Sequence, residues 1–188
     1  TEAAEVAEML GDYDQAVEML SGGLAIADEV GFSGHPLAMR GRLANVEVLR
    51  GNLDVAESIH RSLLDDPQAL GVPWLQAMLR VGLAAIERRR GDLDLAAANL
   101  ERAWRMPRTQ SVPYMRALLS VAFGYLADQR GDAATALQHQ LDGLVTSHRL
   151  ASPRHVAYSL EGTAGALALA EDAAAHRLGA ELLGRADH

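Results

Sequence analysis

Small and apolar residues recur along this chain with a period of 40 residues, at fixed distances from short polar turns. A small residue lies seven positions before each turn, and an alanine lies five positions after each of the first four turns. The turns begin at Gly11, Gly51, Gly91 and Gly131, with a weaker copy at Glu171. Recurrence on this scale is the signature of a repeat architecture in which each unit is a small group of helices or strands.

Each repeat carries the residues that begin and end two helices. Pro73, Pro113 and Pro153 stand 18 residues before their turns, where proline suits the first position of a helix. The glycine of the turn can adopt the left-handed conformation that ends this helix, and the following Asp or Asn can cap the next one. The pattern therefore predicts ten helices in five antiparallel pairs. They are expected at 1–10 and 14–30, 35–50 and 54–66, 74–90 and 94–106, 114–130 and 134–150, and 154–170 and 174–186.

One such pair cannot bury its apolar side alone, so successive pairs are expected to stack into one continuous core. The prediction is an all-α fold, an α-solenoid of five helix pairs that forms a right-handed superhelix. Residues 1–188 are expected to be one domain, and because Thr1 is not an initiator Met, a fragment of a larger protein. The repeats are expected at about 1–30, 31–70, 71–110, 111–150 and 151–188.

The charged residues at the turns have structural explanations. Three turns directly follow an arginine, which stands at the negative end of a helix dipole. These arginines are Arg50, Arg90 and Arg130. Asp12 and Asp14 recur at later helix starts, so capping and dipole compensation explain them better than a metal-binding loop does. Asp65 and Asp66 precede Pro67 and predict a loop after a helix end.

Composition supports a helical, soluble protein. Ala and Leu together supply about a third of the 188 residues, and aromatic residues supply 4%. The formal charge of −8 opposes binding to nucleic-acid phosphates or anionic lipid. The uncharged stretches that most resemble membrane segments, 117–127 and 162–170, are too short to span a bilayer. We therefore expect a cytoplasmic protein without nucleic-acid or membrane contacts.

No catalytic, cofactor or metal site is predicted. Cysteine and lysine are both absent, which excludes disulfides, thiolate metal sites and lysine chemistry. The seven histidines form no His-Glu-x-x-His motif, and neither a nucleophile elbow nor a phosphate-binding loop occurs. The chain is therefore not expected to be an enzyme.

The repeat resembles the tetratricopeptide repeat. Leu83-Ala84 stands at the family's first-helix pair, Gly91-Asp92-Leu93 at its turn and Ala96 in its second helix, while Gly11-Asp12-Tyr13 is the turn most like the family's. The period of 40 exceeds the usual 34 residues. Long repeats of this kind, and the segments 159–168 and 175–180, are similar to the sensor arms of bacterial LuxR-type ATP-binding regulators and AfsR-like transcriptional regulators.

This resemblance implies a binding surface. In tetratricopeptide arrays the first helices line the concave face, and repeat position then identifies the side chains expected there. The candidate recognition residues are Asn45, Arg88, Arg89, Tyr125, Gln129 and Tyr158.

The expected function is a non-catalytic protein-interaction or sensor domain of a bacterial transcriptional regulator or signalling ATPase. Its partner would be a protein, a peptide or a neighbouring ATPase domain of the same full-length chain. Alternatives are a small-molecule-binding regulatory module and a stand-alone scaffold for assembling complexes. The first helix, 1–10, has no preceding helix to cover it, so a homodimer through this helix is also expected.

Overall fold

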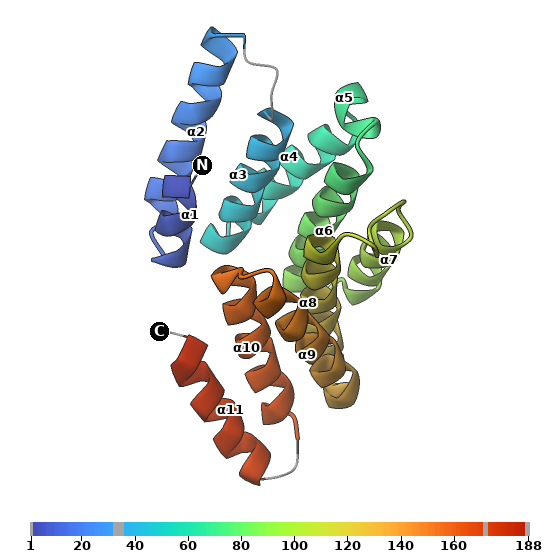
Figure 1. Ribbon diagram of the computed structural model, residues 1–188. Helices are drawn as coiled ribbons and strands as arrows, with labels where there is room; N and C mark the ends of the chain where they lie inside the picture. Colours follow the sequence, from blue (N-terminus) through green and yellow to red (C-terminus); the bar gives the residue numbers. More distant parts are fainter. Residues whose placement is uncertain (1, 32–35, 171–172, 187–188) are drawn as a thin grey trace.

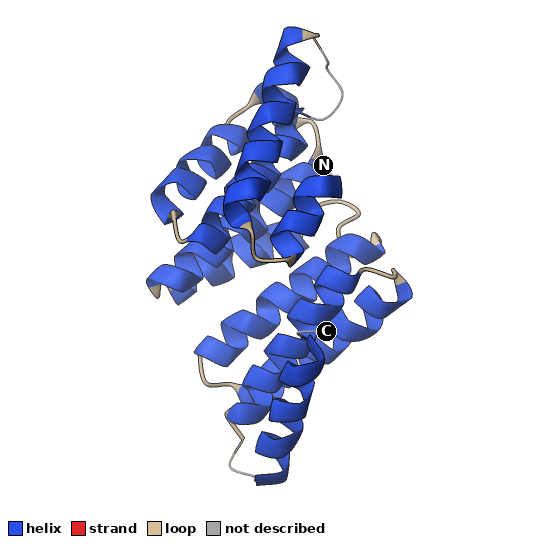
Figure 2. Ribbon diagram, turned by 90° about the vertical axis from the view of Figure 1, so that its left-hand side faces the viewer, coloured by secondary structure: helices blue, strands red, loops and turns tan. Residues whose placement is uncertain are grey.

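The structure is a computed structural model that describes residues 2–31, 36–170 and 173–186 (Figure 1). Helix is the only regular secondary structure within these ranges (Figure 2), so the prediction of an all-α fold is confirmed. The helices are α1 (Glu2–Met9), α2 (Tyr13–Glu29), α3 (Pro36–Arg50), α4 (Leu53–Leu64), α5 (Pro67–Leu70), α6 (Pro73–Arg90), α7 (Leu93–Trp104), α8 (Pro113–Gln129), α9 (Ala133–Arg149), α10 (Pro153–Ala168) and α11 (Ala173–Ala186).

All ten predicted helices are present within a few residues of their expected bounds, and one further helix was missed. Asp65 and Asp66 form the predicted loop after the end of α4, and the missed helix is the short α5, which begins at Pro67. The Asp66 carboxylate accepts a hydrogen bond of 2.7 Å from the Gln68 N–H, and Pro67 occupies the first helical position. Residue 35 and the turn copy at 171–172 lie outside the described residues.

The turns follow the predicted chemistry in part. Each turn glycine within the described residues has the left-handed conformation, with φ between 74° and 87° for Gly11, Gly51, Gly91 and Gly131.

The capping predictions hold for two of the four turns. Asp12 and Asp132 each accept a 3.0 Å hydrogen bond from the N–H three residues later. Asn52 and Asp92 make no such bond, so the capping prediction is wrong there. In these two turns the next residue's N–H donates instead to the turn glycine's carbonyl, and the Asn52 amide donates to Glu47 at 2.6 Å.

Successive helix pairs pack on one another in a repeating way. The second helix of each pair contacts the first helix of the next pair: α2 with α3, α4 with α6, α7 with α8, and α9 with α10. The first helices also contact one another, α3 with α6, α6 with α8, and α8 with α10. Figure 1 shows this succession from the blue α1 to the red α11. Separate clusters of buried apolar side chains join each pair to the next.

Two polar side chains fill a core position that leucine fills in two other repeats. The fully buried residues at this 40-residue spacing are Leu20, His60, Leu100 and Gln140. A glycine on the next pair makes room for each polar residue. A Cβ atom at Gly82 would stand 2.3 Å from the His60 ring, and one at Gly162 would stand 2.2 Å from Gln140. The polar residue and the facing glycine are therefore a matched pair.

This matching predicts opposite effects of two glycine-to-alanine substitutions. Gly82→Ala should lower the free energy of unfolding by about 1–3 kcal/mol, because the rigid, buried His60 ring has little room to move. Gly22→Ala should raise it by about 0.5–1 kcal/mol, since Gly22 is an exposed position within α2 with open space around its Cα. Urea unfolding of both variants checks this, and equal effects of the two would contradict the matched-pair account.

The burial of His60 also predicts a dependence of stability on pH. Its two ring nitrogens have no hydrogen-bond partner, and burial lowers the pKa of His60 from 6.5 to about 4. Between these pH values the unfolded chain binds more protons than the folded one. Folding stability should therefore fall as the pH drops from about 6.5 towards 4, by about 3 kcal/mol for this residue.

His60→Gln should remove the part of the stability loss at low pH that His60 causes, because glutamine does not titrate. Glutamine is also accommodated at the same repeat position, at Gln140. Urea unfolding at pH 7 and pH 5 measures the change. His148→Gln, on the exposed end of α9, is the control and should keep the pH dependence of the parent chain. If the free energy of unfolding of His60→Gln depends on pH as strongly as that of the parent chain, His60 is not the cause of the pH dependence.

Candidate functional site

Three of the six candidate recognition residues come together where α6, α8 and α10 meet. The guanidinium carbon of Arg88 lies 5.1 Å from the centroid of the Tyr125 ring, in cation–π geometry. The Tyr125 hydroxyl donates to the main-chain carbonyl of Tyr158 at 2.9 Å and lies 3.5 Å from a carboxylate oxygen of Glu161. These contacts join three successive first helices. We call the surface formed by α1, α3, α6, α8 and α10 the first-helix surface.

The other three candidates lie apart from this cluster. Arg89 donates to the main-chain carbonyl of Val48 and thereby ties α6 to α3. The exposed Asn45 has its amide oxygen 3.0 Å from the point where a Cβ of Gly82 would stand. Gln129 is exposed at the last residue of α8. The structure therefore supports Arg88, Tyr125 and Tyr158 as a group and leaves Asn45 and Gln129 as separate surface positions.

Burial determines the electrostatics of the cluster. It lowers the pKa of Arg88, and the like charge of Arg89 adds to this effect. Burial also raises the pKa of Tyr125, whose hydroxyl therefore stays protonated at neutral pH and can donate a hydrogen bond. Burial raises the pKa of Asp128 as well, against the opposing charge of Arg88. Within the described part of the chain, no carboxylate lies within ion-pair distance of Arg88.

A second charged cluster on the first-helix surface was missed by sequence reasoning. Glu8 of α1 pairs with the Arg42 Nε of α3 at 2.7 Å and with an Arg154 nitrogen of α10 at 2.9 Å. Glu5 lies 3.5 Å from Arg42 and 4.0 Å from Arg154. The Glu8 side chain is only 6% exposed. Residues 146 positions apart in the sequence are therefore joined by one carboxylate.

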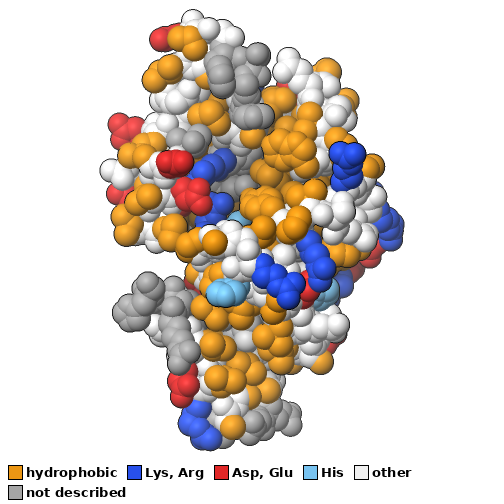
Figure 3. Space-filling view, viewed as in Figure 1, with side chains coloured by type: hydrophobic (Ala, Val, Ile, Leu, Met, Phe, Trp, Pro, Cys, Tyr) orange, Lys and Arg blue, Asp and Glu red, His pale blue; other side chains and the backbone are white. Residues whose placement is uncertain are grey.

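The repeat itself holds a signal for this cluster. At the repeat position of Arg42, the later copies carry Gly82, Ala122 and Gly162. An arginine at a position that the three later repeats fill with small residues marks Arg42 as exceptional. Figure 3 shows arginine and acidic side chains next to one another on the face of the molecule drawn in Figure 1, set among hydrophobic side chains.

The arginines before the turns pair with the preceding repeat. Each binds an aspartate 36 residues earlier: Arg50 with Asp14 at 2.6 Å, Arg90 with Asp54 at 2.5 Å, and Arg130 with Asp94 at 2.9 Å. The aspartates are almost fully exposed, so each pair contributes little to stability.

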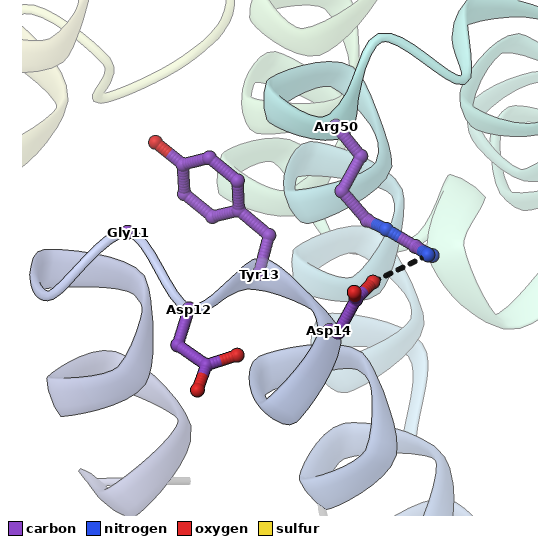
Figure 4. Close-up of a pocket in the computed structure, with 5 residues that line it drawn as sticks. All are labelled: Gly11, Asp12, Tyr13, Asp14 and Arg50. Carbon is purple, nitrogen blue, oxygen red and sulfur yellow. Dashed lines mark ion pairs between the residues drawn. The ribbon is translucent and has the colours of Figure 1, made fainter.

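A shallow, open depression of about 300 Å³ lies at the first of these pairs. Gly11, Asp12, Tyr13, Asp14 and Arg50 line it (Figure 4), and a similar depression lies one repeat later. The Asp14–Arg50 pair crosses one side of it, while the Tyr13 ring and the Asp12 carboxylate point in different directions (Figure 4). The depression thus lies where two repeats meet, and turn geometry and ion pairing account for the residue types that line it.

Among the residues that the structure describes, no group of three or more His, Asp or Glu side chains is placed to hold a metal ion. None of the described helices combines the length and the apolar character needed to cross a membrane. Comparison with models of known families, with curated proteins and with solved structures finds no match.

Proposed function

We propose that this chain is a tetratricopeptide-like α-solenoid whose first-helix surface binds a segment of a partner protein. The observation that carries the proposal is Arg88, a cation stacked on Tyr125 where three first helices meet. Among the described residues no carboxylate lies within ion-pair distance of Arg88, and Asp128 acts on it only as a nearby charge. A partially buried cation of this kind is well suited to pair with an acidic side chain or a carboxyl terminus of a partner.

The repeating packing supports the solenoid part of the proposal. Contacts between second and next first helices recur along the chain, and so do contacts between successive first helices. In such an array the first helices form one extended surface, which suits an extended or helical protein segment. Following the resemblance of the repeats, we propose that the domain is the cytoplasmic sensor arm of a bacterial regulator, with a neighbouring ATPase domain as one candidate partner.

The surface favours a protein partner over a small molecule. Small-molecule sites are concave and enclose most of their ligand. The two depressions described above are open and lie at turns rather than beside Arg88 and Tyr125. The Arg88–Tyr125 contact instead extends across α6 and α8, as expected of an interaction surface.

Selection from a displayed peptide library tests the proposal. Peptides that bind the intact chain are expected to lose about tenfold or more in affinity for Arg88→Ala and for Tyr125→Ala, because the two side chains form one contact site. Fluorescence anisotropy with labelled peptides measures the affinities.

Arg105→Ala is the matched control. Arg105 is also an arginine, but it is 75% exposed near the end of α7 and pairs with Glu101 one turn earlier. It should leave peptide affinity unchanged. Peptides that bind all three variants as tightly as the parent chain would place their binding site elsewhere and overturn the proposal.

The amino-terminal pair supports a second part of the proposal, a homodimer contact. Three large apolar side chains of the first helix and its turn are more than half exposed: Val6, Met9 and Leu10. They stand on the side of α1 that a preceding helix would cover in a longer array. We propose that a second copy of the chain covers them.

Met9→Glu should shift self-association towards the monomer, because it places a charge on this apolar side. Leu95→Glu is the control, since Leu95 is 57% exposed on α7, much as Met9 is 56% exposed on α1. Sedimentation velocity over a range of concentrations reports the change. A parent chain that stays monomeric at high concentration, or equal effects of both variants, would contradict the dimer contact.

A further inference from the structure

The strongest long-range feature of the molecule is the ion-pair cluster between α1 and α10. Glu8 binds Arg42 and Arg154 together, and Glu5 lies within ion-pair distance of both. Figure 1 shows α1 beside the end of α10 that follows the loop from α9. Other inter-pair contacts join neighbours in the succession, whereas this one joins the first pair to the last.

Helix α1 contributes only small side chains to the buried apolar cluster that it shares with α2 and α3. Its buried side chains are the small residues Ala4 and Ala7, whereas its larger apolar residues Val6 and Met9 are exposed. A helix of eight residues is also too short to be stable alone in water. The position of α1 therefore depends on its carboxylates as well as on its small buried face. Ion pairs of this kind can be exchanged for equivalent pairs with another molecule.

The two arginines have binding capacity that α1 does not use. The side chains of Arg42 and Arg154 are each 20% exposed, so both are largely covered. One terminal nitrogen of Arg42 is buried without any hydrogen-bond partner. A buried unsatisfied donor is costly, and a further carboxylate would remove that cost. The nearby Glu5 and Glu8 raise the pKa of Arg154 against the opposing effect of burial, so this side chain stays charged.

Helix α1, which contacts Arg42 and Arg154 in this structure, indicates what kind of segment these two arginines can bind. Helix α1 carries Glu2, Glu5 and Glu8 at intervals of three residues and no basic residue. Two of these carboxylates, those of Glu5 and Glu8, lie within ion-pair distance of Arg42 and Arg154. A partner helix with the same acidic row would make the same pairs. Because the whole chain carries a charge of −8, an acidic partner would be attracted to local groups of arginines such as this one rather than to the surface in general.

We propose that Arg42 and Arg154 form a binding site for an acidic helical segment of a partner protein, and that α1 occupies this site in the unbound chain. The inference rests on the proposed interaction function and adds the chemistry of the partner and an intramolecular competitor. Binding then requires α1 to give up its ion pairs, which lowers the apparent affinity by the fraction of molecules in which the site is open.

The test uses a synthetic peptide that carries the α1 sequence, residues 2–10, within an alanine-rich helical host. Its affinity for the full chain is measured by fluorescence anisotropy at low salt. The double variant Glu5→Gln and Glu8→Gln should bind the peptide about tenfold more tightly than the parent chain, because the competitor has lost its charges. Adding Arg154→Gln to this variant should abolish the gain.

Two controls separate charge from site. The variant Glu18→Gln and Glu29→Gln removes the same number of charges at exposed positions of α2 and should leave the affinity unchanged. A peptide with glutamine in place of its glutamates should not bind. Hydrogen exchange of the parent chain gives a readout that needs no variant: the acidic peptide should speed exchange of the α1 amides, since it displaces that helix.

The inference is overturned if the double variant binds the peptide no more tightly than the parent chain does, or if Arg154→Gln leaves binding intact. Either result would leave the proposed function standing, provided that selected peptides still require Arg88 and Tyr125. If selected peptides also bind without Arg88 and Tyr125, the proposed function is overturned together with the further inference.

Discussion

Each helix pair in this chain can bury its apolar side only against the next pair, and this constraint determines where residues of each size and charge can stand. Small residues recur where helices approach closely, and glycine recurs where the chain turns. The constraint also explains the polar core positions. His60 and Gln140 are tolerated because Gly82 and Gly162 leave the volume that each side chain needs.

Sequence reasoning succeeded where the governing contacts repeat at a fixed spacing. The helix pairs and their turns follow from the period of 40, since each copy of the repeat supplies independent evidence. It failed where one copy departs from the others. Helix α5 depends on Asp66 and Pro67, which occur together in one repeat alone. At Asn52 and Asp92 the predicted side-chain cap is absent, because the next residue's N–H bonds to the turn glycine's carbonyl, and residue type does not predict this difference.

The candidate site shows the same division. Repeat position selected Arg88, Tyr125 and Tyr158 from three different places on successive first helices, and in the structure Tyr125 contacts both Arg88 and the main-chain carbonyl of Tyr158. It could not show that Arg89 would turn to the carbonyl of Val48. It also could not show that Arg154 would meet Glu8, because a local period carries no information about which distant repeats approach each other.

A chain stabilised by contacts between neighbouring pairs has few ways to join its distant parts. In this molecule the joint between the first pair and α10 is made by charged side chains rather than by a large apolar contact. Ion pairs respond to salt and to competing charges far more than buried apolar surface does. The part of the structure that holds α1 across the first-helix surface is therefore also the part that a charged partner can most readily replace. Helix α1 buries only small apolar side chains, and Glu8 pairs with two arginines. The helix is therefore held in place largely by ion pairs, which the carboxylates of another molecule can also form.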